Sequence, residues 1–124
     1  MSSKDIPRAL LRKASHHIKD AHTLRSSGDL KGSAGSYYQS MLVASEALLY
    51  LHGETVQQPM MIVEEMRAQL VDTGLFPEEA YSWLRDTHDL LNGGGTDGDL
   101  QLSDLADLED RAEKYLITAE NMLL

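Results

Sequence analysis

Apolar residues recur every three or four positions along most of the chain, a spacing that predicts helices. Five segments follow it, at about residues 5–26, 29–52, 60–70, 77–91 and 103–123. The first and last segments have clear apolar stripes, made of Leu11, Ala14, Ile18, Ala21 and Leu24 in one and of Leu105, Leu108, Ala112, Leu116, Ala119 and Leu123 in the other. No segment alternates over the length of a strand. We therefore expect an all-α fold of about five helices in a single domain, residues 1–124.

The segment 29–52 is apolar around much of its circumference, which predicts a central helix. Its stripe includes Tyr37, Tyr38 and Met41. The two tyrosines diverge by about 100° around a helix, so both are buried only if other elements surround it. We expect these three residues to fill space between helices or between subunits, with a hydrogen-bond partner for each hydroxyl. Ligand stacking on the tyrosines is the alternative.

Turn signals separate the segments. Gly28, Gly53 and Gly74 each follow a helical stretch, and Gly28 suits the left-handed position after a helix end. The third segment places Met60, Val63, Met66 and Leu70 on one stripe, and Trp83 is expected to be partly buried in the fourth. Ser103 is predicted to cap the last helix. Residues 92–102 are predicted to form a flexible Gly-rich loop; its "GGGTDG" matches the dinucleotide fingerprint, but no strand precedes it.

Composition excludes several classes of function. The chain has 124 residues, no cysteine, and 11 basic against 20 acidic side chains, for a net charge of −9. Phosphate backbones repel such a charge, so no strong nucleic-acid binding is expected. The charged opening has no signal-peptide core, and no apolar run approaches the roughly 20 residues that span a bilayer. These features predict a soluble, cytoplasmic protein without membrane contact.

Candidate chemistry is sparse. The histidines at 16, 17 and 22 show no metal-ligand spacing, so neither a metal site nor a cofactor is predicted. Arg85 and His88 are three positions apart on the fourth helix and share a face, where they could act as an acid–base couple. The favoured interpretation is two solvated polar residues beside Asp86 and Asp89.

The stretch "SSGDLKGSAGSYYQSMLVASEALLYLHG" (26–53) resembles the second helix of the HEPN family, in its branch of small stand-alone bacterial and archaeal proteins. That branch has a G-D turn, then an A-Y-Y-A-M-F-x-A-A-x-A-L-L pattern and a final Gly. The corresponding residues here are Tyr38, Met41, Ala44, Ala47, Leu48, Leu49 and Gly53. Residues 60–84 are similar to the family's third helix, T-G-x-x-P turn and fourth helix, and 102–123 to its last helix.

The resemblance implies an antiparallel helical bundle that is usually dimeric. Many members are metal-independent ribonucleases with an R-x4-6-H motif near the final helices, and others are partners of a minimal nucleotidyltransferase. Here the region between the last two helices has no Arg, His or Tyr. Arg12 and His17 match R-x4-H, but on the first helix and about 140° apart. We treat that match as chance.

We therefore expect a non-catalytic, HEPN-like interaction or nucleotide-associated module that forms a homodimer. The resemblance implies a nucleotidyltransferase as its partner, in a toxin–antitoxin-like or stress system. One alternative is an endoribonuclease toxin that uses Arg85 and His88. Another is a small-molecule sensor that uses the groove of the bundle.

Overall fold

The computed structural model describes residues 4–92 and 101–123, and both stretches are helical with no strand. The elements are α1 (Asp5–Ser26), α2 (Leu30–Leu51), α3 (Pro59–Glu65), the π-helical segment η1 (Met66–Val71), α4 (Glu78–Asn92) and α5 (Leu102–Leu123). The all-α class and the expected five helices are confirmed.

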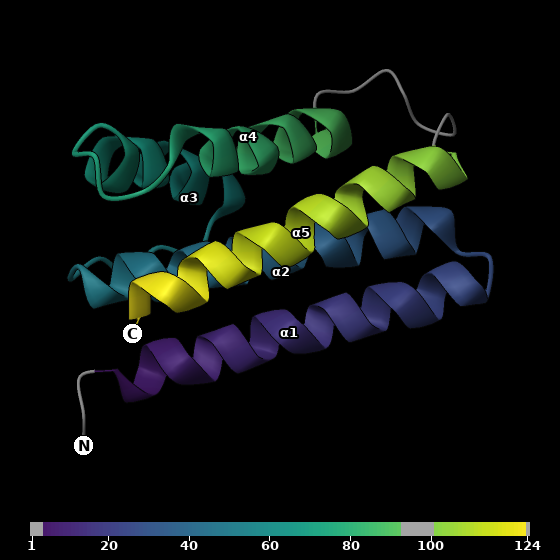
Figure 1. The fold of residues 1–124 in the computed structure, drawn as a ribbon, viewed down its shortest axis with the longest axis horizontal. Helices are drawn as coiled ribbons and strands as arrows, with labels where there is room; N and C mark the ends of the chain where they lie inside the picture. The colour runs from purple at the N-terminus through teal and green to yellow at the C-terminus, as the bar shows by residue number, and fades with distance from the viewer. Residues whose placement is uncertain (1–3, 93–100, 124) are drawn as a thin grey trace.

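Helix α2 forms the centre of the bundle. It contacts α1, α3, η1, α4 and α5, and 13 of its 22 residues are buried. Figure 1 shows α2 and α5 alongside each other, with α1 on one side of them and α3 and α4 on the other. Helices α1 and α4 run in the opposite direction to α2 and α5. The other helices of the chain therefore cover the apolar circumference of α2.

The turn between α1 and α2 follows the local sequence. Gly28 has a φ of +89°, the left-handed conformation predicted for it, which side chains with a Cβ rarely adopt. Asp29 then caps α2, because its Oδ1 accepts the backbone N–H of Gly32 at 2.9 Å. The buried Ser33 hydroxyl donates to the carbonyl of Ala21 at 2.8 Å and links the two helices.

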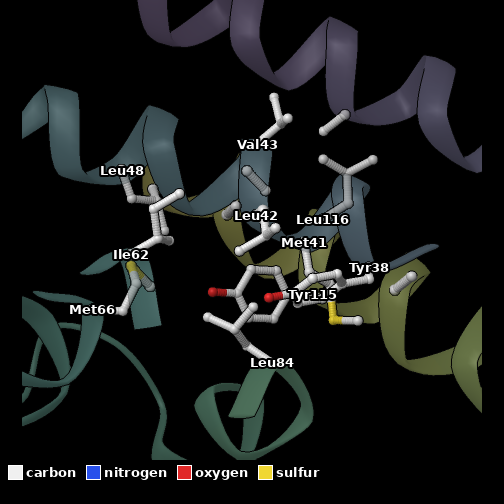
Figure 2. Close-up of a cluster of buried hydrophobic side chains, with 14 of the residues drawn as sticks. Tyr38, Met41, Leu42, Val43, Leu48, Ile62, Met66, Leu84, Tyr115 and Leu116 are labelled. Carbon is white, nitrogen blue, oxygen red and sulfur yellow. The ribbon is translucent and has the colours of Figure 1, made fainter. Parts of the chain in front are cut away.

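The core lies where α2, α3, η1, α4 and α5 meet. Figure 2 shows side chains from these elements around Tyr38 and Tyr115, with Leu84 of α4 and Met66 of η1 among them. The predicted stripes of the first and last helices contribute to the same core, and Trp83 is partly buried against it as expected. The Tyr115 hydroxyl lies 2.5 Å from Ser45 Oγ.

Two local predictions are wrong. Met60 is 56% exposed, because it lies in the first turn of α3 after Pro59, and Ile62 is buried instead. Val63, Met66 and Leu70 are buried as predicted, the last two within the wider turns of η1. Ser103 does not cap α5, since that helix already begins at Leu102, and Asp104 Oδ2 accepts the Gln101 N–H at 2.9 Å.

The predicted flexible loop 92–102 begins and ends in helices, since Asn92 is the last residue of α4 and Leu102 the first of α5. Residues 93–100 of that loop lie outside the described part of the chain. Among the helices described, none combines the length and the apolar composition needed to cross a membrane.

Candidate functional site

The adjacent tyrosines of α2 contact different neighbours. Tyr37 is fully buried, with its hydroxyl 3.3 Å from Glu109 Oε2 on α5 and its ring edge-on to His22 on α1. Tyr38 is 6% exposed and its hydroxyl lies 2.5 Å from Nδ1 of His88 on α4. Met41 is fully buried beside them. Helices of the same chain therefore cover all three residues proposed as a ligand or interface site.

Burial raises the pKa of both phenols, because it disfavours the charged phenolate. The pKa of Tyr37 rises to about 12, with the Glu109 carboxylate adding to the effect of burial. The pKa of Tyr38 also rises to about 12 through burial. Both hydroxyls stay protonated near neutral pH. The Tyr37 hydroxyl donates to Glu109 on α5, and the Tyr38 hydroxyl is hydrogen-bonded to His88 on α4.

Arg85 and His88 lie in different environments although they share α4. The Arg85 guanidinium is on the surface, where its Nη2 lies 3.5 Å from Asp86 Oδ1. The His88 side chain is inside the bundle and only 8% exposed. Its Nδ1 is hydrogen-bonded to the Tyr38 hydroxyl and lies 3.4 Å from the amide nitrogen of Asn92. The favoured expectation of two solvated residues therefore holds for Arg85 and is wrong for His88, which packing against α2 buries.

This arrangement leaves the Arg–His couple poorly suited to cleaving RNA. A general acid or base must reach the reacting atoms within hydrogen-bond distance or through one water. The Nδ1 of His88 is occupied by the Tyr38 hydroxyl and the Asn92 amide of its own chain, so this ring nitrogen is engaged within the fold. The Asp86 carboxylate partly offsets the positive charge that Arg85 would offer to a phosphate.

A groove opens at the end of the bundle where α1 begins and α2 ends. It consists of two adjoining hollows of about 190 Å³ and 340 Å³. Both are lined by Thr55, Val56 and Gln57, from the connection between α2 and α3. We call this surface the end groove; its other lining residues are Ile6, Leu10, Glu46, Tyr50, Glu54, Gln58 and Met61.

The end groove combines exposed apolar side chains with carboxylates. Ile6 and Met61 are each 48% exposed and Tyr50 is 38% exposed. Glu46 and Glu54 line the same hollow. Partial burial raises the pKa of Glu46, and Lys13 opposes that shift. Such a surface suits an apolar contact bordered by a positive charge.

Sequence reasoning missed this groove. Ile6, Tyr50 and Met61 are apolar residues that fall outside the stripes predicted for their helices, and that mismatch is the signal that could have identified them. Their common location depends on how α1, α2 and α3 meet, which no spacing within one helix reveals.

A further hollow of about 360 Å³ lies between α1 and α5. Arg8 and Arg12, one turn apart on α1, line it together with Leu11, Ser15, Glu120 and Leu123. Arg12 therefore lies beside a groove, whereas His17, its partner in the R-x4-H match, is not among the lining residues. This hollow is one place where the small-molecule alternative could act.

Comparison of the chain with models of protein families, with curated proteins and with solved structures finds no match.

Proposed function

We propose that this protein is a non-catalytic, HEPN-like binding module and that its partner is a minimal nucleotidyltransferase. The observation that carries the proposal is the separation of Arg85 and His88. The histidine that an RNA-cleaving site would need is only 8% exposed and bonded to Tyr38. The arginine lies on the surface beside Asp86.

The end groove is the surface proposed to receive the partner. The apolar side chains of Ile6, Tyr50 and Met61 line its hollows and are partly exposed to solvent. Exposed apolar residues grouped around a concave surface are typical of sites that bind other molecules.

Charge indicates the chemistry of the partner's docking face. This chain carries a net charge of −9, and Glu46 and Glu54 line the groove itself. A partner face with an apolar centre and Lys or Arg at its border would fit, since complementary potentials favour association. The same net charge supports a protein partner over RNA, whose phosphates it repels.

The test measures complex formation between this chain and the product of the gene next to its own. We expect that gene to encode a minimal nucleotidyltransferase, and the two purified proteins to form a complex in isothermal titration calorimetry. Met61→Lys should weaken the complex at least tenfold, because it places a cation in the end groove opposite a basic face. Leu90→Lys is the matched control, since Leu90 is 38% exposed on α4 and the substitution makes the same charge change.

A neighbouring gene of another kind would contradict the proposed partner. A complex that is equally sensitive to Met61→Lys and Leu90→Lys would contradict the end groove as its docking site. Binding of nucleotides by this chain alone, lost on substitution of Arg8 or Arg12, would instead favour the sensor alternative.

A further inference from the structure

Three side chains with metal-ligating atoms converge where α1 crosses α5. His22 comes from α1, and Glu109 and Glu113 are one turn apart on α5 and share a face. The Nε2 of His22 lies 3.6 Å from Glu109 Oε1 and 3.7 Å from Glu113 Oε1. All three donor atoms lie within 4.8 Å of one another.

The outer contacts of this triad orient its donors. Glu109 uses its other oxygen, Oε2, to accept from Arg25 Nη1 at 2.6 Å and from the Tyr37 hydroxyl at 3.3 Å. The Oε1 atom is thereby directed toward His22. Tyr37 is fully buried and its ring also contacts the His22 ring edge-on, with centroids 5.9 Å apart. One fixed tyrosine thus positions two of the three donors, as hydrogen-bonded neighbours do for ligands in metal sites.

We propose that His22, Glu109 and Glu113 bind a divalent ion of the first transition row, such as Zn²⁺ or Co²⁺. One imidazole nitrogen and two carboxylate oxygens form a donor set that these ions accept. Ligand atoms lie about 2.0–2.2 Å from such an ion and therefore about 3.4 Å from one another around a tetrahedral centre. The distances of 3.6 Å and 3.7 Å from His22 Nε2 to the two carboxylate oxygens are close to that separation. This site is independent of the proposed partner.

The exposure of the three side chains determines how many further ligands the ion can take, and the surrounding charges determine its affinity. The side chains of His22, Glu109 and Glu113 are 44%, 32% and 47% exposed, which leaves positions on the ion for water or for a ligand from another molecule. The two carboxylates attract the cation, whereas the Arg25 guanidinium on Glu109 opposes it. We therefore expect an affinity in the micromolar range.

The experiment titrates ZnCl₂ into the full chain by calorimetry and records the visible absorption of the Co²⁺ complex. The result expected is one ion per chain, with affinity lowered at least tenfold in His22→Ala and in Glu113→Gln. His16→Ala is the matched control, because His16 is also an exposed histidine on α1 and should bind the ion like the parent. Since the ligands are partly exposed, circular dichroism without metal should show that each variant keeps its helical content.

No saturable binding by the parent would overturn the proposal. Binding that is unchanged in both His22→Ala and Glu113→Gln would overturn it as well, because the ion would then lie elsewhere.

Discussion

The hydroxyl of Tyr38 lies 2.5 Å from Nδ1 of His88, and this contact joins α2 to α4 inside the bundle. Because burial raises the pKa of Tyr38 to about 12, the phenol keeps its proton near neutral pH and forms this hydrogen bond as a neutral hydroxyl. The amide nitrogen of Asn92 approaches the same Nδ1 at 3.4 Å. The imidazole of His88 is therefore part of the packing between two helices, whereas Arg85 lies on the outer surface of α4 beside Asp86.

Tyr38→Phe tests the structural role of this contact. Loss of the hydroxyl removes the nearest hydrogen-bond partner of a buried ring nitrogen, and an unsatisfied buried polar atom costs about 1–3 kcal/mol. We expect the free energy of unfolding in urea to fall by about that amount. Tyr50→Phe removes a hydroxyl from a partly exposed tyrosine of the same helix and should change stability by less than about 0.5 kcal/mol. Equal effects of the two substitutions would contradict the assigned role.

Ser40 and Ser45 form a second matched pair on α2. Both are fully buried, but Ser40 Oγ has no hydrogen-bond partner among the described residues. Ser45 Oγ donates to the carbonyl of Met41 at 2.8 Å, and it is therefore available to accept from the Tyr115 hydroxyl. The pKa of Tyr115 is raised by its burial, which keeps that hydroxyl protonated.

The two serines should respond oppositely to alanine. Ser45→Ala leaves the Tyr115 hydroxyl buried without its acceptor and should lower the free energy of unfolding by about 1–3 kcal/mol. Ser40→Ala removes a buried hydroxyl that gains no hydrogen bond in the described structure, so it should be neutral or stabilising by up to about 1 kcal/mol. Urea denaturation measures both. A loss for Ser40→Ala as large as that for Ser45→Ala would show that Ser40 has a partner.

Alkaline pH should destabilise the bundle through its buried tyrosines. The folded pKa values of Tyr37 and Tyr38 are about 12, above the ordinary value of about 10. Between these values the folded chain holds more protons than the unfolded chain, so stability falls as pH rises. The contribution is complete below about pH 10 and is lost through about pH 12. Urea unfolding followed across this interval should show a shallower decline in Tyr37→Phe than in the parent.

The predicted homodimer is tested by sedimentation velocity at micromolar concentration. The apolar circumference of α2 leaves little surface for such a dimer, because helices of the same chain cover it. Helix α5, by contrast, exposes Ile117 at 55%, and we expect the dimer to form through this helix. A dimer that dissociates in Ile117→Lys would support α5 as its interface. A monomer at all concentrations would contradict the prediction.

The helices were predictable because each apolar stripe has to be buried, and α2, with an apolar circumference, had to be central. The left-handed conformation predicted for Gly28 is also confirmed. The cap that Asp29 provides for α2 follows a similar local rule, but it was not predicted. The π-helical turns of η1 were not predictable, since Met66 and Leu70 at a spacing of four suit ordinary helical turns equally well.

The candidate sites depended on contacts between helices. The shared face of Arg85 and His88 was inferred from spacing on α4, but Tyr38 on α2 determines that the histidine is buried. The triad of His22, Glu109 and Glu113 joins residues from opposite ends of the chain, so its spacing carries no metal signature. Such sites become visible only when the packing of α1 against α5 is known.

The proposed function is that of a bundle that binds a partner and does not cleave RNA. Incubation of the purified protein with mixed RNA in the presence of a chelator is the direct test of whether it cleaves RNA. The parent, Arg85→Ala and His88→Gln should all leave the RNA intact, as judged by gel electrophoresis against a protein-free control. His88→Gln should still show a cost in stability, because the buried contact with Tyr38 is altered. Cleavage by the parent that disappears in both variants would contradict the account and assign Arg85 and His88 to a ribonuclease site.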